Sequence, residues 1–70
     1  MNKKEKQFKE ASGMLDDICK SYNETKANNG DMQEISNALF LAILAVESTG
    51  FKIEINMSES GYIERLAVGY

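Results

Sequence analysis

The sequence has no His, no Pro and no Trp, and it contains a single Cys. A lone cysteine cannot form an internal disulfide, so the chain is not a disulfide-stabilised scaffold. Without His, the usual zinc ligand sets and the commonest general base of enzymes are missing. The five glycines stand singly, so the sequence holds no glycine-rich phosphate-binding loop. We therefore expect no metal site, no cofactor and no catalytic residue.

Long apolar runs and an excess of positive charge are also missing. The longest apolar run, Ala38 to Val46, has nine residues, whereas a membrane-spanning helix needs about 20. Eight basic and eleven acidic side chains give a net charge of −3, while nucleic-acid-binding proteins usually show a basic stripe. No apolar segment follows the N-terminal lysines, so we expect no secretory signal. The unpaired thiol fits a cytoplasmic localisation.

The 70 residues have an ordinary globular composition, with 43% hydrophobic and 27% charged side chains. This length predicts one small α+β domain over residues 1–70. A chain this short buries only about 60% of the surface that its unfolded form exposes. We therefore expect a small core and a modest free energy of unfolding.

The first segment, Lys3 to Ala27, has the spacing of an amphipathic helix. Its apolar residues recur at intervals of three and four, and they share one face: Phe8, Ala11, Leu15, Ile18 and Tyr22. Asn28-Asn29-Gly30 predicts the helix end, because Asn and Gly tolerate the left-handed backbone conformation. Asp31, with Glu34 three residues later, predicts the N-cap of a second helix that runs to about Thr49. The short connection makes the two helices antiparallel neighbours.

The period of the sequence changes from 3.6 to 2 after Gly50. Apolar and polar residues alternate strictly from Phe51 to Met57, which is typical of a half-buried strand. Ser58–Gly61 has the composition of a turn, and Tyr62–Val68 predicts a second strand. The predicted fold is α+β, with two antiparallel helices followed by a C-terminal β-hairpin (ααββ). Dimerisation can extend such a hairpin into a larger sheet.

The charges of the two strands favour one register. A four-residue loop places Leu66 opposite Ile53 and pairs Arg65 with Glu54 on the other face of the hairpin. In this register Glu64 falls on the apolar face. Both helices can then cover that face, and the predicted core consists of Phe8, Leu15, Ile18, Tyr22, Ile35, Leu39, Ile43, Val46, Phe51, Ile53, Ile55 and Leu66.

The second helix carries more apolar surface than this core uses. At about 100° per residue, Phe40 and Leu44 project a quarter to a third of a turn from the core face, and Leu41 lies almost opposite it. Fully burying one large apolar side chain stabilises a protein by about 1.5–3 kcal/mol. A chain this short has few other residues that could cover these three side chains. Either the first helix and the hairpin enclose the second helix as a central rod, or these residues form a contact surface.

A contact surface would include Phe40, Leu41 and Leu44, and we add Tyr62 because tyrosine rings are common at interfaces. Tyr70 is a second such ring. An unpaired edge of the hairpin offers another route to a homodimer. The sequence does not choose between the helix and the hairpin edge.

The remaining reactive side chains have simpler explanations. Cys19 borders the apolar stripe of the first helix without a base to activate it, so we interpret it as a small buried residue. Asp16 and Asp17 point about 100° apart on a helix and cannot easily share a metal ion. The lysines of the first ten residues are interrupted by Glu5 and Glu10, which argues against nucleic-acid binding.

We therefore predict a non-enzymatic protein-interaction module that forms a homodimer and acts as an inhibitor or adaptor by binding another macromolecule. Its size and charge resemble those of phage inhibitors of a host enzyme or defence system, which is an analogy only. The alternative is a protein that binds or sequesters a small molecule in a pocket at the helix or dimer interface. That pocket would be lined by Phe40, Leu44, Met57 and Tyr62.

Overall fold

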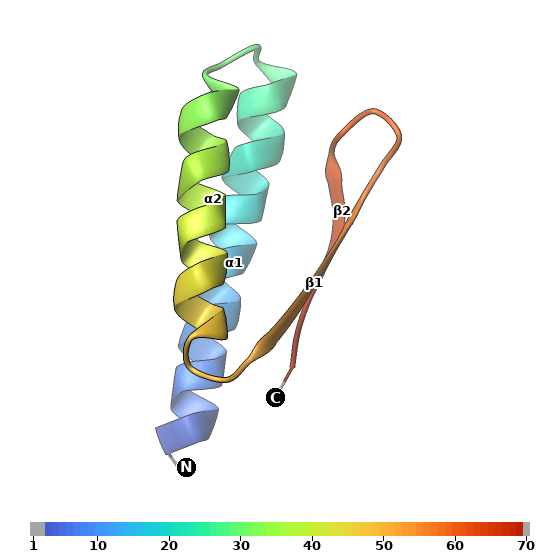
Figure 1. Ribbon diagram of the computed structural model, residues 1–70. Helices are drawn as coiled ribbons and strands as arrows, with labels where there is room; N and C mark the ends of the chain where they lie inside the picture. The colour runs from blue at the N-terminus through green and yellow to red at the C-terminus, as the bar shows by residue number, and fades with distance from the viewer. Residues whose placement is uncertain (1–2, 70) are drawn as a thin grey trace.

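The computed structural model describes residues 3–69, so Tyr70 lies outside the described residues. Four elements follow one another along the chain. They are α1 (Lys3–Ala27), α2 (Met32–Glu47), β1 (Lys52–Met57) and β2 (Ile63–Gly69). The helices run antiparallel and side by side, and the hairpin lies on one side of the pair (Figure 1). The predicted ααββ order is confirmed, with α2 ending two residues earlier than expected.

The turn between the helices follows the predicted signals. Asn29 takes the left-handed conformation with φ 55°, and the Gly30 N–H donates to the Thr25 carbonyl at 2.8 Å. The Asp31 carboxylate accepts the backbone N–H groups of Gln33 at 3.1 Å and Glu34 at 3.3 Å. These bonds satisfy two of the free donors at the start of α2 and fix the point where the helix begins.

Two glycines shape the hairpin. Gly50 has φ 95° in the turn after α2, and Gly61 has φ 90° in the loop between the strands. Both values lie in the region that residues with a side chain rarely adopt. The hairpin loop closes where the Ser58 N–H donates to the Tyr62 carbonyl at 2.8 Å. The loop therefore contains five residues, 58–62, between the last pair of the sheet, Met57 and Ile63.

The predicted strand register is wrong by two residues. Leu66 lies opposite Ile55 rather than Ile53, and Arg65 lies opposite Asn56 rather than Glu54. One residue of the shift comes from the longer loop, and the other comes from a bulge next to Asn56 and Met57. A shift of two keeps each side chain on its own face of the strand. The apolar face is thus retained, although the predicted charge pair is lost.

The bulge also corrects the expectation for Glu64. This residue is the unpaired extra residue of β2, and it is exposed rather than on the apolar face. Its neighbour Ile63 is buried instead. The bulge interrupts the strict alternation that the prediction assumed, since two residues of β2 oppose a single residue of β1.

The core lies where α1, the second half of α2 and the start of the hairpin meet. Leu15 is completely buried there, with Ala42, Val46 and Phe51 around it. The rings of Phe8 and Phe51 meet edge to face with centroids 5.6 Å apart. Cys19 and Ile63 are also buried. Three of the twelve predicted core residues, Leu15, Val46 and Phe51, are buried, and the other nine are only half-buried: Phe8, Ile18, Tyr22, Ile35, Leu39, Ile43, Ile53, Ile55 and Leu66. Neither helix within residues 3–69 has the length and apolar character needed to cross a membrane.

Candidate interaction surface

Three large apolar side chains of α2 are exposed. The exposed fractions are 60% for Phe40, 64% for Leu41 and 47% for Leu44. We call these three residues the α2 patch. On the other side of the helix, Ala42 and Val46 are buried in the core. The interpretation of α2 as a central rod enclosed by α1 and the hairpin is therefore wrong.

The hairpin leaves the α2 patch uncovered because it is attached to α1. The side-chain amide of Asn23 on α1 donates to the Ile63 carbonyl at 2.9 Å. The Asn23 Oδ1 accepts the Ile63 N–H at 2.8 Å. These two bonds hold β2 against α1, and Phe40, Leu41 and Leu44 of α2 stay exposed.

Smaller residues extend the α2 patch across the helix pair. Leu41 follows Ala38 by three residues and precedes Ala45 by four, so the three lie on one side of α2. Ala45 shares a hollow with Met14 and Ala11 of α1. Met14 is 42% exposed. We call Ala11, Met14, Ala38, Leu41 and Ala45 the open helix face.

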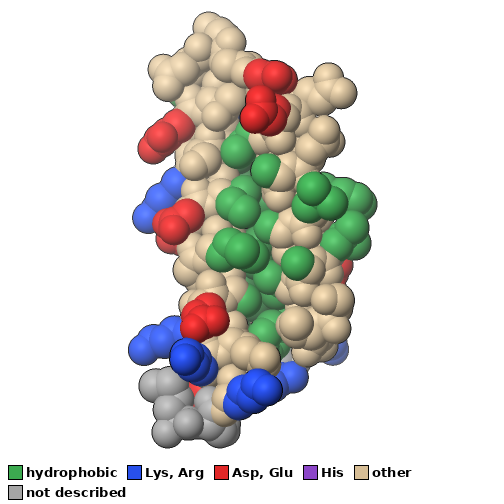
Figure 2. Space-filling view, turned by 90° about the vertical axis from the view of Figure 1, so that its left-hand side faces the viewer, with side chains coloured by type: hydrophobic (Ala, Val, Ile, Leu, Met, Phe, Trp, Pro, Cys, Tyr) green, Lys and Arg blue, Asp and Glu red, His purple; other side chains and the backbone are tan. Residues whose placement is uncertain are grey.

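The open helix face lies on the side of the helix pair that faces away from the hairpin. Figure 2 shows this side, with hydrophobic side chains along its middle and a second hydrophobic cluster beside them. No charged residue occurs in α2 between Glu34 and Glu47. Uncharged apolar surface of this kind is typical of sites that contact another protein.

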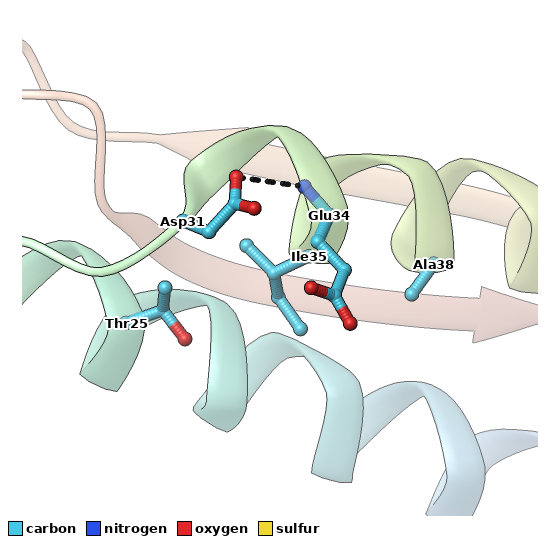
Figure 3. Close-up of a pocket in the computed structure, with 5 residues that line it drawn as sticks. All are labelled: Thr25, Asp31, Glu34, Ile35 and Ala38. Carbon is cyan, nitrogen blue, oxygen red and sulfur yellow. Dashed lines mark hydrogen bonds between the residues drawn. The ribbon is translucent and has the colours of Figure 1, made fainter.

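Two shallow hollows are lined by residues of both helices. One, of about 250 Å³, is the hollow beside Met14 and Ala45. The other, of about 320 Å³, lies where α1 ends and α2 begins, between Thr25, Ile35 and Ala38 (Figure 3). The Asp31 carboxylate at its edge is engaged with the backbone of its own helix.

The small-molecule pocket that the sequence suggested at the helix or dimer interface stays a prediction. Five hollows among residues 3–69 are lined by other residues than Phe40, Leu44, Met57 and Tyr62. Tyr62 is half-buried, and its ring centroid lies 5.6 Å from the Lys26 Nζ on α1. This contact places the ring against α1. Of the four predicted interface residues, the structure brings together the three of the α2 patch.

Cys19 is buried, with 5% of its surface exposed. Burial raises the pKa of its thiol above the ordinary value, and the nearby Asp16 carboxylate raises it further. Both effects favour the neutral thiol, which is a poor nucleophile. The prediction of a small buried residue is confirmed. Within residues 3–69, no three His, Cys, Asp or Glu side chains converge as a metal site would require.

Sequence reasoning missed the residues that enlarge the surface and the one that positions the hairpin. Met14 lies next to Leu15 but outside the apolar stripe, and Ala38 and Ala45 are too small to be noticed as contact residues. Their spacing of three and four from Leu41 was the available signal. No local sequence signal points to Asn23, because its partner is the backbone of Ile63, 40 residues away.

Comparison of the chain with protein-family models, curated proteins and solved structures gives no match.

Proposed function

We propose that this chain is a non-enzymatic protein-interaction module that associates with itself as a homodimer and acts as an inhibitor or adaptor by binding another macromolecule. The observation that carries the proposal is the α2 patch, in which Phe40, Leu41 and Leu44 are each about half exposed or more. Burial of apolar surface is favourable by about 25 cal/mol per Å². A second protein that covers the patch gains this free energy.

The shape of the single chain supports the same proposal. Its accessible surface is 4941 Å², compared with about 4,400 Å² for a compact monomer of its mass. Its radius of gyration is 12.7 Å, compared with about 11 Å for a compact domain of this length. The chain is thus more elongated and has more surface than its length requires, which favours association with another surface.

Sedimentation measures the self-association directly. We expect the wild type to change from monomer to dimer between low and high micromolar concentration. The double variant Phe40→Glu/Leu44→Glu should remain a monomer, because two carboxylates would have to be buried without partners. Lys52→Glu changes the net charge by the same amount at an exposed position of β1, and it should dimerise like the wild type. A wild type that stays monomeric at high micromolar concentration would contradict the proposal.

The binding of another macromolecule needs a separate experiment. Tagged wild type and Leu41→Asp would be used to recover a protein from a host extract, and the recovered protein would be purified. We expect the purified protein to bind the wild type and to lose its affinity for Leu41→Asp, while circular dichroism confirms that this variant is folded. If the wild type itself fails to bind any purified candidate, the inhibitor or adaptor role is wrong.

A further inference from the structure

We propose that two copies of this chain associate through the open helix face about a two-fold axis perpendicular to the helices, so that the α1–α2 pairs run antiparallel and form a four-helix assembly. This inference rests on the proposed function, because it names the surface through which the proposed homodimer forms, namely the open helix face, which shares Leu41 with the α2 patch. It also chooses the helices over the hairpin edge as the site of dimerisation. Three properties of the open helix face support it.

The first property is its shape. Leu41 projects from the open helix face with 64% of its surface exposed. One helical turn further along α2, Ala45 lies beside the hollow of about 250 Å³ that it shares with Met14. A two-fold axis that passes between Leu41 and Ala45 inserts each copy's Leu41 into the hollow of the other. Such reciprocal contacts are the rule at two-fold interfaces, and helices interlock through a projecting side chain and a facing hole.

The second property is the charge at the two ends of this face. Lys3 and Lys6 lie at the start of α1, and Asp31 and Glu34 lie at the start of α2, at the opposite end of the helix pair. Figure 2 shows several Lys and Arg side chains at the lower end, with an acidic side chain close to them, and acidic side chains at the upper end. An antiparallel arrangement sets the basic end of each copy against the acidic end of the other.

Helix geometry brings these charges to the same level. A rise of 1.5 Å per residue places Glu34 about 13 Å from the level of Ile43, which lies midway between Leu41 and Ala45. Met14 lies beside Ala45 in the neighbouring helix, about 3 Å from the level of Ile43, and Lys6 lies about 12 Å further on, so Lys6 is about 15 Å from the level of the axis. The axis that satisfies the Leu41 contact therefore also sets Glu34 of one copy at nearly the same level as Lys6 of the other, on the diagonally opposite helix.

The third property is size. A standard specific interface buries about 800 Å² on each partner. The chain measures 41 × 21 × 17 Å, so one long face is large enough for an interface of that area. The hairpin edge is a poorer candidate, because Lys52 and Glu54 are exposed on β1 and charged side chains on an edge strand hinder pairing. A parallel arrangement of the helices would instead set like charges together at both ends.

Chemical cross-linking tests the arrangement. In a Cys19→Ala background, which leaves no other thiol, Glu34→Cys and Lys6→Cys would be prepared separately, mixed, and treated with a short bismaleimide. We expect cross-linked dimers that contain one chain of each kind, identified by mass. Neither variant alone should cross-link more than the same background carrying Lys52→Cys. Circular dichroism would show that each variant keeps its helices.

The other outcomes overturn specific parts of the proposal. Efficient cross-linking of Glu34→Cys to itself would show a parallel dimer, and cross-linking of Lys52→Cys to itself would show a dimer through the hairpin. Either result contradicts the antiparallel helix interface while leaving the proposed homodimer intact. A chain that sediments as a monomer at high micromolar concentration contradicts both.

Charge reversal gives an independent test by sedimentation. We expect Glu34→Lys and Lys6→Glu each to weaken dimerisation several-fold at low salt, because each places like charges together across the interface. The double variant should recover the wild-type dissociation constant to within about two-fold, since the pair is restored in reverse. Effects of the two substitutions that simply add would contradict the pairing of these ends.

Discussion

The side chain of Asn23 pairs with the backbone of Ile63 as a neighbouring strand would. Its amide donates to the Ile63 carbonyl at 2.9 Å, and its Oδ1 accepts the Ile63 N–H at 2.8 Å. Ile63 is buried, and these two groups lie on the edge of β2 that faces α1. A buried backbone group without a partner is costly, so this single side chain both satisfies the edge and attaches the hairpin to the helices.

Asn23→Ala should therefore lower the free energy of unfolding by about 1–3 kcal/mol, because it leaves two backbone groups of Ile63 without their partner. Urea unfolding followed by circular dichroism measures the change. Ser21→Ala, at an exposed position of the same helix, serves as the control and should have little effect. Equal stability of the two variants would show that the Asn23 bonds are not needed to hold the hairpin.

Replacing the cap of α2 should have a smaller effect. Asp31→Ala removes the acceptor for the Gln33 and Glu34 N–H groups and should cost about 1 kcal/mol. Asp31→Asn keeps a side-chain oxygen at the same place and should retain most of the stability. Thermal unfolding compares the two variants. If Asn destabilises as much as Ala, the charge of Asp31 matters more than its hydrogen bonds.

Two leucines allow the same substitution to be compared at a buried and an exposed position. Leu15 is completely buried and Leu41 is 64% exposed. At a dilution where the wild type is monomeric, Leu15→Ala should cost about 2–5 kcal/mol, whereas Leu41→Ala should cost less than about 0.5 kcal/mol. Urea unfolding gives both values. A large loss of monomer stability in Leu41→Ala would mean that the α2 patch belongs to the fold rather than to an interface.

The Cys19 thiol should react slowly in the folded protein. Its burial limits access, and the raised pKa, caused by burial and then by Asp16, keeps it protonated at neutral pH. Its rate of reaction with a disulfide reagent should be at least about ten-fold lower than in urea-unfolded protein. Comparable rates in the two states would contradict the buried position.

The same raised pKa predicts how stability depends on pH. The unfolded chain loses the thiol proton first as the pH rises, so the free energy of unfolding falls between the ordinary pKa of cysteine and the raised pKa of the folded state. Below that window both states hold the proton and Cys19 adds no pH dependence. Cys19→Ala should lose this part of the alkaline decline, which thermal unfolding at several pH values can measure. Identical pH profiles for wild type and variant would contradict the shift.

Most of the fold could be predicted from local signals. The stripe from Phe8 to Tyr22, the cap at Asp31 and the alternation after Gly50 each specify backbone structure through neighbouring residues only. The strand register could not be predicted in this way. The register depends on whether the loop holds four or five residues and on a bulge near Met57. Each of these features shifts the strand pairing by one residue, although neither has a clear signal in the local sequence.

The excess of apolar surface on α2 was predictable from the sequence, which left two possibilities open: α1 and the hairpin could enclose it, or it could remain exposed as a contact surface. The sequence alone determined that α2 carries apolar side chains on more than one face, because helical geometry fixes their directions. Only the tertiary structure decided which of them stay uncovered. That choice follows from Asn23 attaching β2 to α1, which keeps the hairpin on one side of the helix pair. A contact between residues 40 positions apart depends on how the elements pack, and no local pattern encodes it.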